Sequence, residues 1–122
     1  MGGAFTHSEM LDAIQIVESQ RNHDLSRTIA NMFITSAPVL MQVMRHGSEQ
    51  GNLRELFRAA EALRLSSASL GAFRLANLCR ALVQMPSKKD LATVASQLDA
   101  IERATAIVCA ALMEKEFLSI DQ

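Results

Sequence analysis

Most of this chain consists of long runs of helix-forming residues whose apolar members recur every third or fourth position. Apart from Gly2 and Gly3 at the start, the breaks are Pro38 and Pro86 and the glycines 47, 51 and 71. No stretch alternates apolar and polar residues with a period of two, so we expect no strand. The pattern therefore predicts an all-α protein.

The breaks divide the chain into five expected helices, at about residues 8–20, 24–46, 52–70, 72–85 and from after Ser87 to about Leu118. Ser8 is expected to cap the first helix, and Gly47 to end the second. Asn52 and Glu55 have the spacing of a capping box at the start of the third helix. Pro38 lies inside the second helix, which it is expected to kink because proline removes a backbone donor.

The connections between these helices are short, which forces neighbouring helices to pack antiparallel. We expect an up-down four-helix bundle made of the last four helices, with the short first helix covering one end. With 122 residues there is room for one domain. Its expected bounds are residues 8–118, after a flexible start at 1–7 and before a short tail at 119–122.

The second helix is apolar over more than one face. Its expected inner stripe is Leu25, Ile29, Met32, Ser36, Val39 and Val43, which leaves other apolar residues outside the stripe. Either the first helix covers these residues, or Phe33, Met41 and Phe57 form an exposed patch for a partner helix.

Composition excludes several classes of function. The net charge is −1 and aromatic residues make up 4% without Trp or Tyr, which argues against nucleic-acid binding. The apolar run at 104–113 is too short to span a membrane. No catalytic, cofactor or metal-binding pattern is present, so we expect no enzyme activity and no bound metal or cofactor. Cys79 and Cys109 lie in apolar helical context, as expected for buried thiols of a cytoplasmic protein.

One motif is more specific. Residues 60–72 read Ala-Glu-Ala-Leu-Arg-Leu-Ser-Ser-Ala-Ser-Leu-Gly-Ala, and residues 75–80 read Leu-Ala-Asn-Leu-Cys-Arg. This resembles the signature of histidine phosphotransfer (HPt) domains, His-x-Leu-Lys-Gly-Ser-(Ser/Ala), then Leu/Ile-Gly-Ala and Leu-Ala-x-Leu-Cys. Residues 33–43 resemble the helix before the phosphorylated one, and residues 52–56 resemble its opening. The similarity extends over about residues 8–116.

Two residues depart from that signature. Glu61 occupies the position of the phosphorylated histidine, and Leu65 occupies a position usually held by glycine or another small residue. Arg64 conservatively replaces the neighbouring lysine, and Ser66 matches. Locally, we expect Glu61 to pair with Arg58 or Arg64, each three positions away on the helix.

The resemblance implies a role in bacterial two-component signalling. The expected partner is the receiver domain of a response regulator or a histidine kinase, which would bind near Glu61, Arg64 and Leu65. Because Glu61 and Leu65 depart from the signature, we expect a divergent HPt-like protein that does not transfer phosphate. The resemblance also implies docking through an apolar surface, for which the expected residues are Phe33, Met41 and Phe57. Two alternatives stay open: an active relay through Glu61 or another residue, and a structural module that self-associates as a homodimer.

Overall fold

The computed structural model describes Thr6, Glu9 and residues 24–84 and 91–120. Over these ranges the chain forms the helices α2 (Asp24–Gln50), α3 (Leu53–Leu70), α4 (Phe73–Val83) and α5 (Leu91–Ile120). Strands are absent from these ranges, which confirms the expected all-α class. In the same part of the chain no helix combines the length and hydropathy that crossing a lipid bilayer requires.

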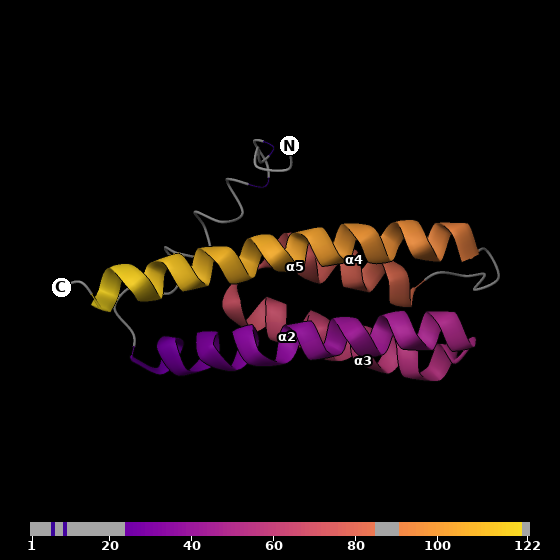
Figure 1. The fold of residues 1–122 in the computed structure, drawn as a ribbon, viewed down its shortest axis with the longest axis horizontal. Coiled ribbons are helices and arrows are strands. Elements are labelled where there is room, and N and C mark those ends of the chain that lie inside the picture. Colours follow the sequence, from indigo (N-terminus) through magenta and orange to yellow (C-terminus); the bar gives the residue numbers. More distant parts are fainter. Residues whose placement is uncertain (1–5, 7–8, 10–23, 85–90, 121–122) are drawn as a thin grey trace.

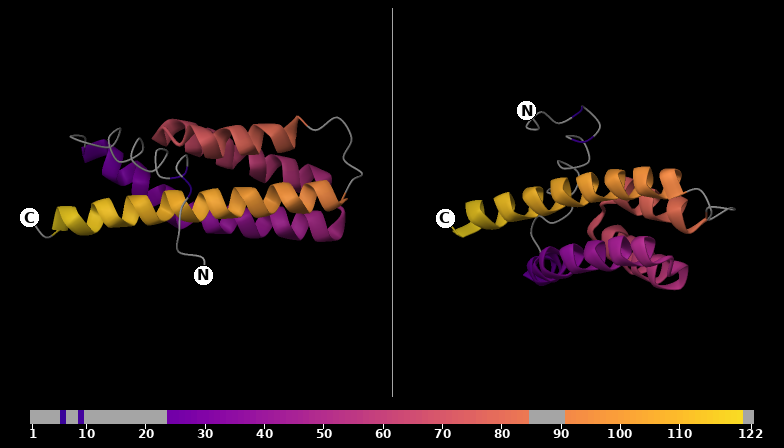
Figure 2. Two further views of the ribbon diagram at one scale, coloured as in Figure 1. Left: turned by 90° about the horizontal axis from the view of Figure 1, so that it is seen from above. Right: turned by 45° about the vertical axis from the view of Figure 1, so that its right-hand side comes forward.

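The four helices form a closed bundle (Figures 1 and 2). Each helix packs on two neighbours, α2 on α3 and α5, and α4 on α3 and α5. In Figure 1, α2 and α3 form the lower layer and α4 and α5 the upper one, and the chain reverses direction at each connection. The expected up-down arrangement is therefore confirmed.

The core lies along the axis of this bundle, where all four helices contribute buried apolar side chains. Its largest fully buried members are Met44, Leu56, Leu63, Leu70, Leu75, Leu82, Val94, Leu98, Ile101, Val108 and Leu112. All of these except Met44 lie on α3, α4 and α5, where they recur at spacings of three, four or seven residues, as the inward face of a helix requires. Each fully buried leucine or isoleucine contributes about 1.5–3 kcal/mol through the hydrophobic effect, so the core supplies most of the stability.

The stripe expected for α2 is wrong. Met32 and Val39 are exposed, at 64% and 56%, whereas Phe33, Ala37, Met41 and Met44 are buried. The inward face is thus rotated by about one residue from the expected one. A helix with apolar residues on several faces does not define its own orientation, because either stripe can be buried.

The expected end of this helix at His46 is also wrong, since α2 continues through Gly47 to Gln50. Gly47 is buried, and a Cβ atom there would lie only 3.0 Å from both the carbonyl oxygen of Asn52 and the backbone nitrogen of Leu56. Glycine is therefore needed at position 47 for the close approach of α3. The chain turns instead at Gly51, whose φ of 71° is left-handed.

The hairpin of α3 and α4 is fixed by caps at both ends of α3. The backbone N–H of Glu55 donates to Oδ1 of Asn52 over 3.1 Å, which confirms Asn52 as the N-cap. Gly71 has a φ of 84°, and the N–H of Ala72 donates to the carbonyl of Ser67 over 2.8 Å. This left-handed cap closes α3 and starts α4 at once.

At the N-terminus, Thr6 and Glu9 cap each other. The N–H of Thr6 donates to the Glu9 carboxylate over 2.8 Å, and the N–H of Glu9 donates to Oγ1 of Thr6 over 3.2 Å. Glu9 also binds Arg103 of α5 through two hydrogen bonds of 2.7 and 3.1 Å. The expected cap at Ser8, the rest of the first helix and the break at Pro86 lie outside the described residues.

Candidate functional site

Glu61 lies near the middle of α3 and is half-buried. Arg64, one turn further on, binds both of its carboxylate oxygens: Nε donates to Oε1 over 3.0 Å and Nη2 donates to Oε2 over 2.5 Å. This two-point arrangement matches the planar fork of a guanidinium to a carboxylate. It confirms the expected local pairing and assigns it to Arg64, which is itself only partly exposed.

The arginines around Glu61 stabilise its ionised form. The hydrogen bonds from Arg64 lower the pKa of the Glu61 carboxyl, and the positive charges of Arg64 and Arg80 lower it further. The pKa of Arg64 is raised in turn by Glu61. Glu61 is therefore a carboxylate at neutral pH, and its oxygens are already engaged as hydrogen-bond acceptors.

The turn between α3 and α4 brings a second arginine, Arg80, close to Glu61. Glu61 and Arg64 from α3, together with Arg80, Val83 and Gln84 from α4, line a hollow of about 390 Å³. One carboxylate thus faces two guanidinium groups. Sequence reasoning missed Arg80, although it lies inside the stretch that carries the motif, because its nearness to Glu61 depends on how α4 folds back along α3.

Leu65 follows Glu61 by one turn and is 54% exposed. Its side chain occupies surface that a glycine would leave free. Three serines near it do not form an anion-binding cluster, because each donates its hydroxyl proton to the carbonyl four residues earlier. These bonds join Ser66 to Ala62, Ser67 to Leu63 and Ser69 to Leu65, over 3.0, 2.7 and 3.0 Å.

The apolar surface differs from the expected one. Phe33 and Met41 are buried, at 2% and 6% exposed, and Phe57 is partly buried against the core. The expectation that Phe33 and Met41 are exposed is therefore wrong. Because the inward face of α2 is rotated, the large apolar side chains that this helix exposes are Met32 and Val39 instead.

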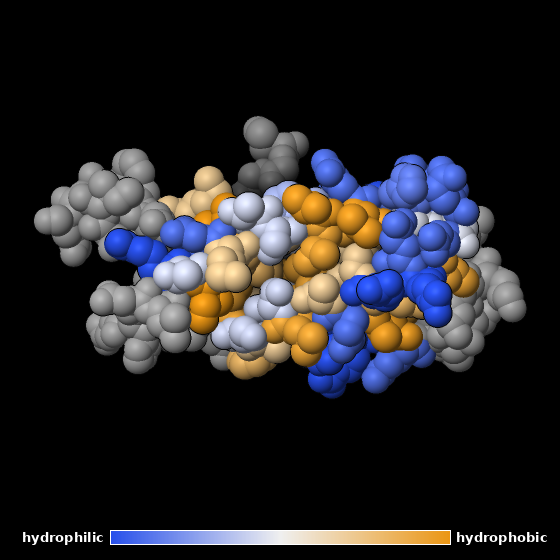
Figure 3. Space-filling model, turned by 90° about the horizontal axis from the view of Figure 1, so that it is seen from below, coloured by the Kyte–Doolittle hydropathy of each residue, from blue (hydrophilic) through white to orange (hydrophobic). Residues whose placement is uncertain are grey.

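The face over α2 and α3 carries hydrophobic side chains across its middle, with a large group of hydrophilic side chains toward one end and a smaller group toward the other (Figure 3). Between the two helices, a hollow of about 450 Å³ is lined by Leu40 and Val43 of α2 and by Arg58 and Ala62 of α3, among others. An apolar band bordered by charge is typical of a surface that binds another protein.

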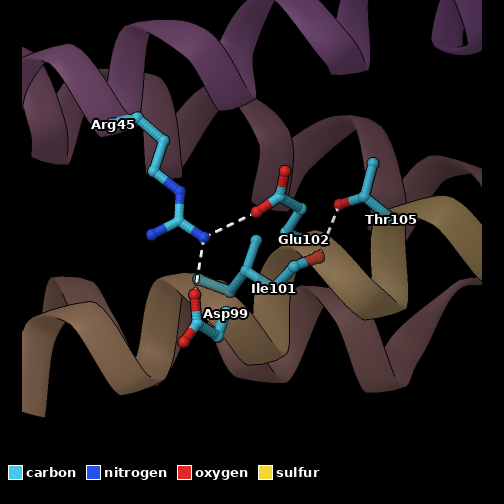
Figure 4. Close-up of polar contacts among 5 residues, drawn as sticks. All are labelled: Arg45, Asp99, Ile101, Glu102 and Thr105. Carbon is cyan, nitrogen blue, oxygen red and sulfur yellow. Dashed lines mark hydrogen bonds and ion pairs between the residues drawn. The ribbon is translucent and has the colours of Figure 1, made fainter.

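A second polar cluster joins α2 to α5 (Figure 4). Nη2 of Arg45 donates to the carboxylates of Asp99 and Glu102, over 2.7 and 2.6 Å. We call these three residues the α2–α5 clasp. The two carboxylates raise the pKa of Arg45. Close by, Oγ1 of Thr105 donates to the carbonyl of Ile101 over 2.7 Å.

Neither cysteine has the environment of a reactive thiol. Both are free, Cys79 is buried and Cys109 is partly buried. Burial raises the pKa of Cys79 to about 12 and also raises that of Cys109, so both are protonated at neutral pH. Within the described ranges no three His, Cys, Asp or Glu side chains are grouped so that they could hold a metal ion.

One of three comparisons with known proteins gave a match. A search of curated proteins and a search of solved structures each found no match. A scan against family models matches the Hpt domain over residues 28–113, which includes α3, α4 and Glu61. Hpt domains are carriers of phosphoryl groups in phosphorelay signalling. With well over half of its length matched, in a bundle of antiparallel helices, the chain belongs to the Hpt domain family.

Proposed function

We propose that this protein binds a signalling partner through the surface around Glu61 and does not transfer phosphate. The partner is the receiver domain of a response regulator or a module of a sensor kinase. One observation carries the proposal: the motif position of the phosphorylated histidine holds Glu61, both of whose carboxylate oxygens are bound by Arg64.

The chemistry of phosphotransfer supports the loss of activity. A histidine nitrogen attacks the phosphorus of an aspartyl phosphate, so that an N–P bond forms, the O–P bond breaks and the aspartate carboxylate leaves. Glu61 is a weaker nucleophile, because Arg64 lowers its pKa and occupies its oxygens. Its product would be a mixed anhydride instead of a phosphoramidate. The exposed Leu65 also narrows the approach to position 61.

Docking, by contrast, needs only a surface. The exposed Val39 and Leu65 and the hollow lined by Leu40 and Val43 give an apolar centre, and charged residues lie beside it. A protein that keeps this surface can regulate by occupancy, because a partner bound to it is withheld from other phosphotransfer proteins. Two free cysteines are consistent with the cytoplasm, where we place this function.

Binding is tested by calorimetric titration of the purified protein with the receiver domains and kinase modules encoded in the same genome. We expect at least one to bind, and the variant Leu65→Asp to weaken that complex, since it places a charge on the apolar surface. Failure of every receiver and kinase module to bind would refute the proposal.

Transfer is tested by incubation with a receiver that carries radiolabelled phosphate. The wild-type protein and the control variant Glu61→Gln are expected to stay unlabelled. The double variant Glu61→His with Leu65→Gly restores the motif at both positions where this chain departs from it, and we expect it to become labelled. Label on the wild-type protein that is absent from Glu61→Gln would show that Glu61 accepts phosphate, which contradicts the proposal.

The exposure of Met32 and Val39 on α2 favours a second candidate, a homodimer that pairs these faces. Sedimentation at several concentrations distinguishes the two. A stable dimer that the variant Met32→Asp with Val39→Asp dissociates would support self-association, whereas a monomer would exclude it.

A further inference from the structure

Charge is unevenly distributed along this chain. Residues 53–84, which form α3, α4 and their turn, contain five arginines and two glutamates, a formal charge of +3, whereas the whole chain has −1. The two glutamates, Glu55 and Glu61, are both on α3, and α4 has no acidic residue. The α3–α4 hairpin is therefore a cationic region of a slightly acidic protein.

Most of this positive charge is not neutralised. Arg54, Arg58, Arg74 and Arg80 are exposed, and in the part of the chain that the structure describes none of them forms an ion pair. By contrast, Arg45 and Arg103 each bind carboxylates. An exposed guanidinium without a partner can bind a carboxylate of another molecule through two parallel hydrogen bonds.

Arg80 is the unpaired arginine that lies at Glu61. It lines the hollow beside Glu61 and Arg64, and its charge lowers the pKa of Glu61. Arg64 is not available in the same way, because two of its nitrogens donate to Glu61. A carboxylate that approached this hollow from outside would therefore find Arg80 as its free donor.

The exposed face of α4 is continuous with this place. Phe73, Asn77, Arg80 and Gln84 are spaced by three or four positions, so they share one side of the helix, and all four are exposed. Phe73 is 53% exposed. Aromatic residues and arginine are the types enriched in the energetically important parts of protein interfaces.

We propose that the docking surface extends from α3 onto α4, where Arg80 selects a partner whose contacting surface is acidic. This inference rests on the proposed function, and it names the chemistry of the partner surface and a specificity-determining residue. A partner carboxylate pairs with Arg80 beside Glu61, and the remaining positive charge of the hairpin steers the acidic surface toward it.

A protein surface fits these observations better than nucleic acid does. The net charge of the whole chain is −1, so a long polyanion would be repelled by much of the molecule. Of the large apolar side chains that are exposed in the described residues, Phe73 is the one aromatic, which gives a single stacking platform. The charge is concentrated on one hairpin, as suits a compact acidic patch.

The test is a calorimetric titration with the receiver or kinase module that binds the wild-type protein most tightly. We expect Arg80→Gln to weaken binding about five- to tenfold at low salt, and by less at high salt, because salt screens the interaction. The matched control is Arg74→Gln, which removes another exposed charge from a different side of the same helix. It should change the dissociation constant by less than about twofold.

Equal effects of Arg80→Gln and Arg74→Gln would overturn the inference and leave the proposed function standing. Absence of any partner would refute the proposed function, and the inference with it. Amide NMR shifts give a second reading: changes at residues 77–84 support contact with α4, and changes confined to α2 and α3 oppose it. Tighter binding of single-stranded RNA than of the partner, lost in Arg80→Gln, would also overturn the inference.

Discussion

The α2–α5 clasp and the Glu61 cluster, which consists of Glu61, Arg64 and Arg80, contain the same two kinds of charged group in opposite proportions. In the clasp, one arginine on α2 is shared by two carboxylates on α5, which are 54 and 57 residues away in the sequence. In the Glu61 cluster, one carboxylate is bound by Arg64, three residues away, and lines the same hollow as Arg80. The clasp neutralises the charge of Arg45 and joins two helices, whereas the Glu61 cluster leaves the positive charge of Arg80 exposed.

The difference shows which polar groups serve the fold and which remain available for a partner. A long-range ion pair restrains two helices relative to each other, so its removal changes stability. A pair within one turn adds little to the fold, because the helix holds both residues close together already. What the Glu61 cluster provides is a fixed geometry and residual charge.

The largest expected effect is on the core, and it tests which face of α3 is buried. Leu63→Ala removes a side chain that is fully buried on α3, and we expect it to lower the free energy of unfolding by about 2–5 kcal/mol. The matched control is Leu65→Ala on the same helix, which removes an exposed leucine and should stay within about 0.5 kcal/mol. Urea denaturation followed by circular dichroism measures both. Similar values for the two variants would contradict the assignment of the inner face.

A smaller effect separates the two ion pairs. Arg45→Gln breaks the bonds of α2 to both carboxylates of α5, and Arg45 is only one-third exposed. We expect a loss of about 0.5–1 kcal/mol in the free energy of unfolding. Arg64→Gln breaks a pair within one helix and should lower the free energy of unfolding by less than Arg45→Gln does. A greater loss for Arg64→Gln would reverse the comparison.

For the affinity for a partner, we expect a larger effect from the Glu61 cluster than from the clasp. Glu61→Gln releases Arg64 and removes a negative charge from the cluster, so an acidic partner should bind about two- to fivefold more tightly at low salt. Glu102→Gln makes the same chemical change in the clasp, away from the hairpin, and should leave affinity nearly unchanged. Titration of both variants with the same partner measures this. Weaker binding by Glu61→Gln would mean that Glu61 itself contacts the partner.

The smallest effect is on proton binding. The folded-state pKa of Glu61 is lowered from its ordinary value of 4.5, so its pairing stabilises the protein above that pH and is lost as pH falls through the lowered pKa. Arg64→Gln should return the pKa of Glu61 toward 4.5. Glu9, whose pKa Arg103 lowers to about 2, should not change in this variant. NMR titration of the carboxyl carbons reads both groups, and a pKa of Glu61 that is equal in both proteins would contradict the assigned pairing.

Much of the site could be predicted because it is built from interactions between residues close together in the sequence. The spacing of Asn52 and Glu55 predicted the cap of α3, and the three-residue separation of Glu61 and Arg64 made their pairing available within one turn. The motif also placed Glu61 at the histidine position, and the helical spacing of the apolar residues in α3 and α5 matches their buried faces. Each of these depends on neighbours within a few residues, and sequence spacing fixes those directly.

What only the tertiary structure decided involves neighbours far apart in the sequence. The orientation of α2, which buries Phe33 and Met41 and exposes Met32 and Val39, depends on which stripe the other helices accept. The use of Gly47 as a contact depends on the approach of α3, and the meeting of Arg80 with Glu61 depends on the path of α4. The sequence by itself determined the helices and the residue at the motif position. Packing chose the exposed surface, because side chains of similar hydropathy on several faces leave that choice to the shape of the whole core.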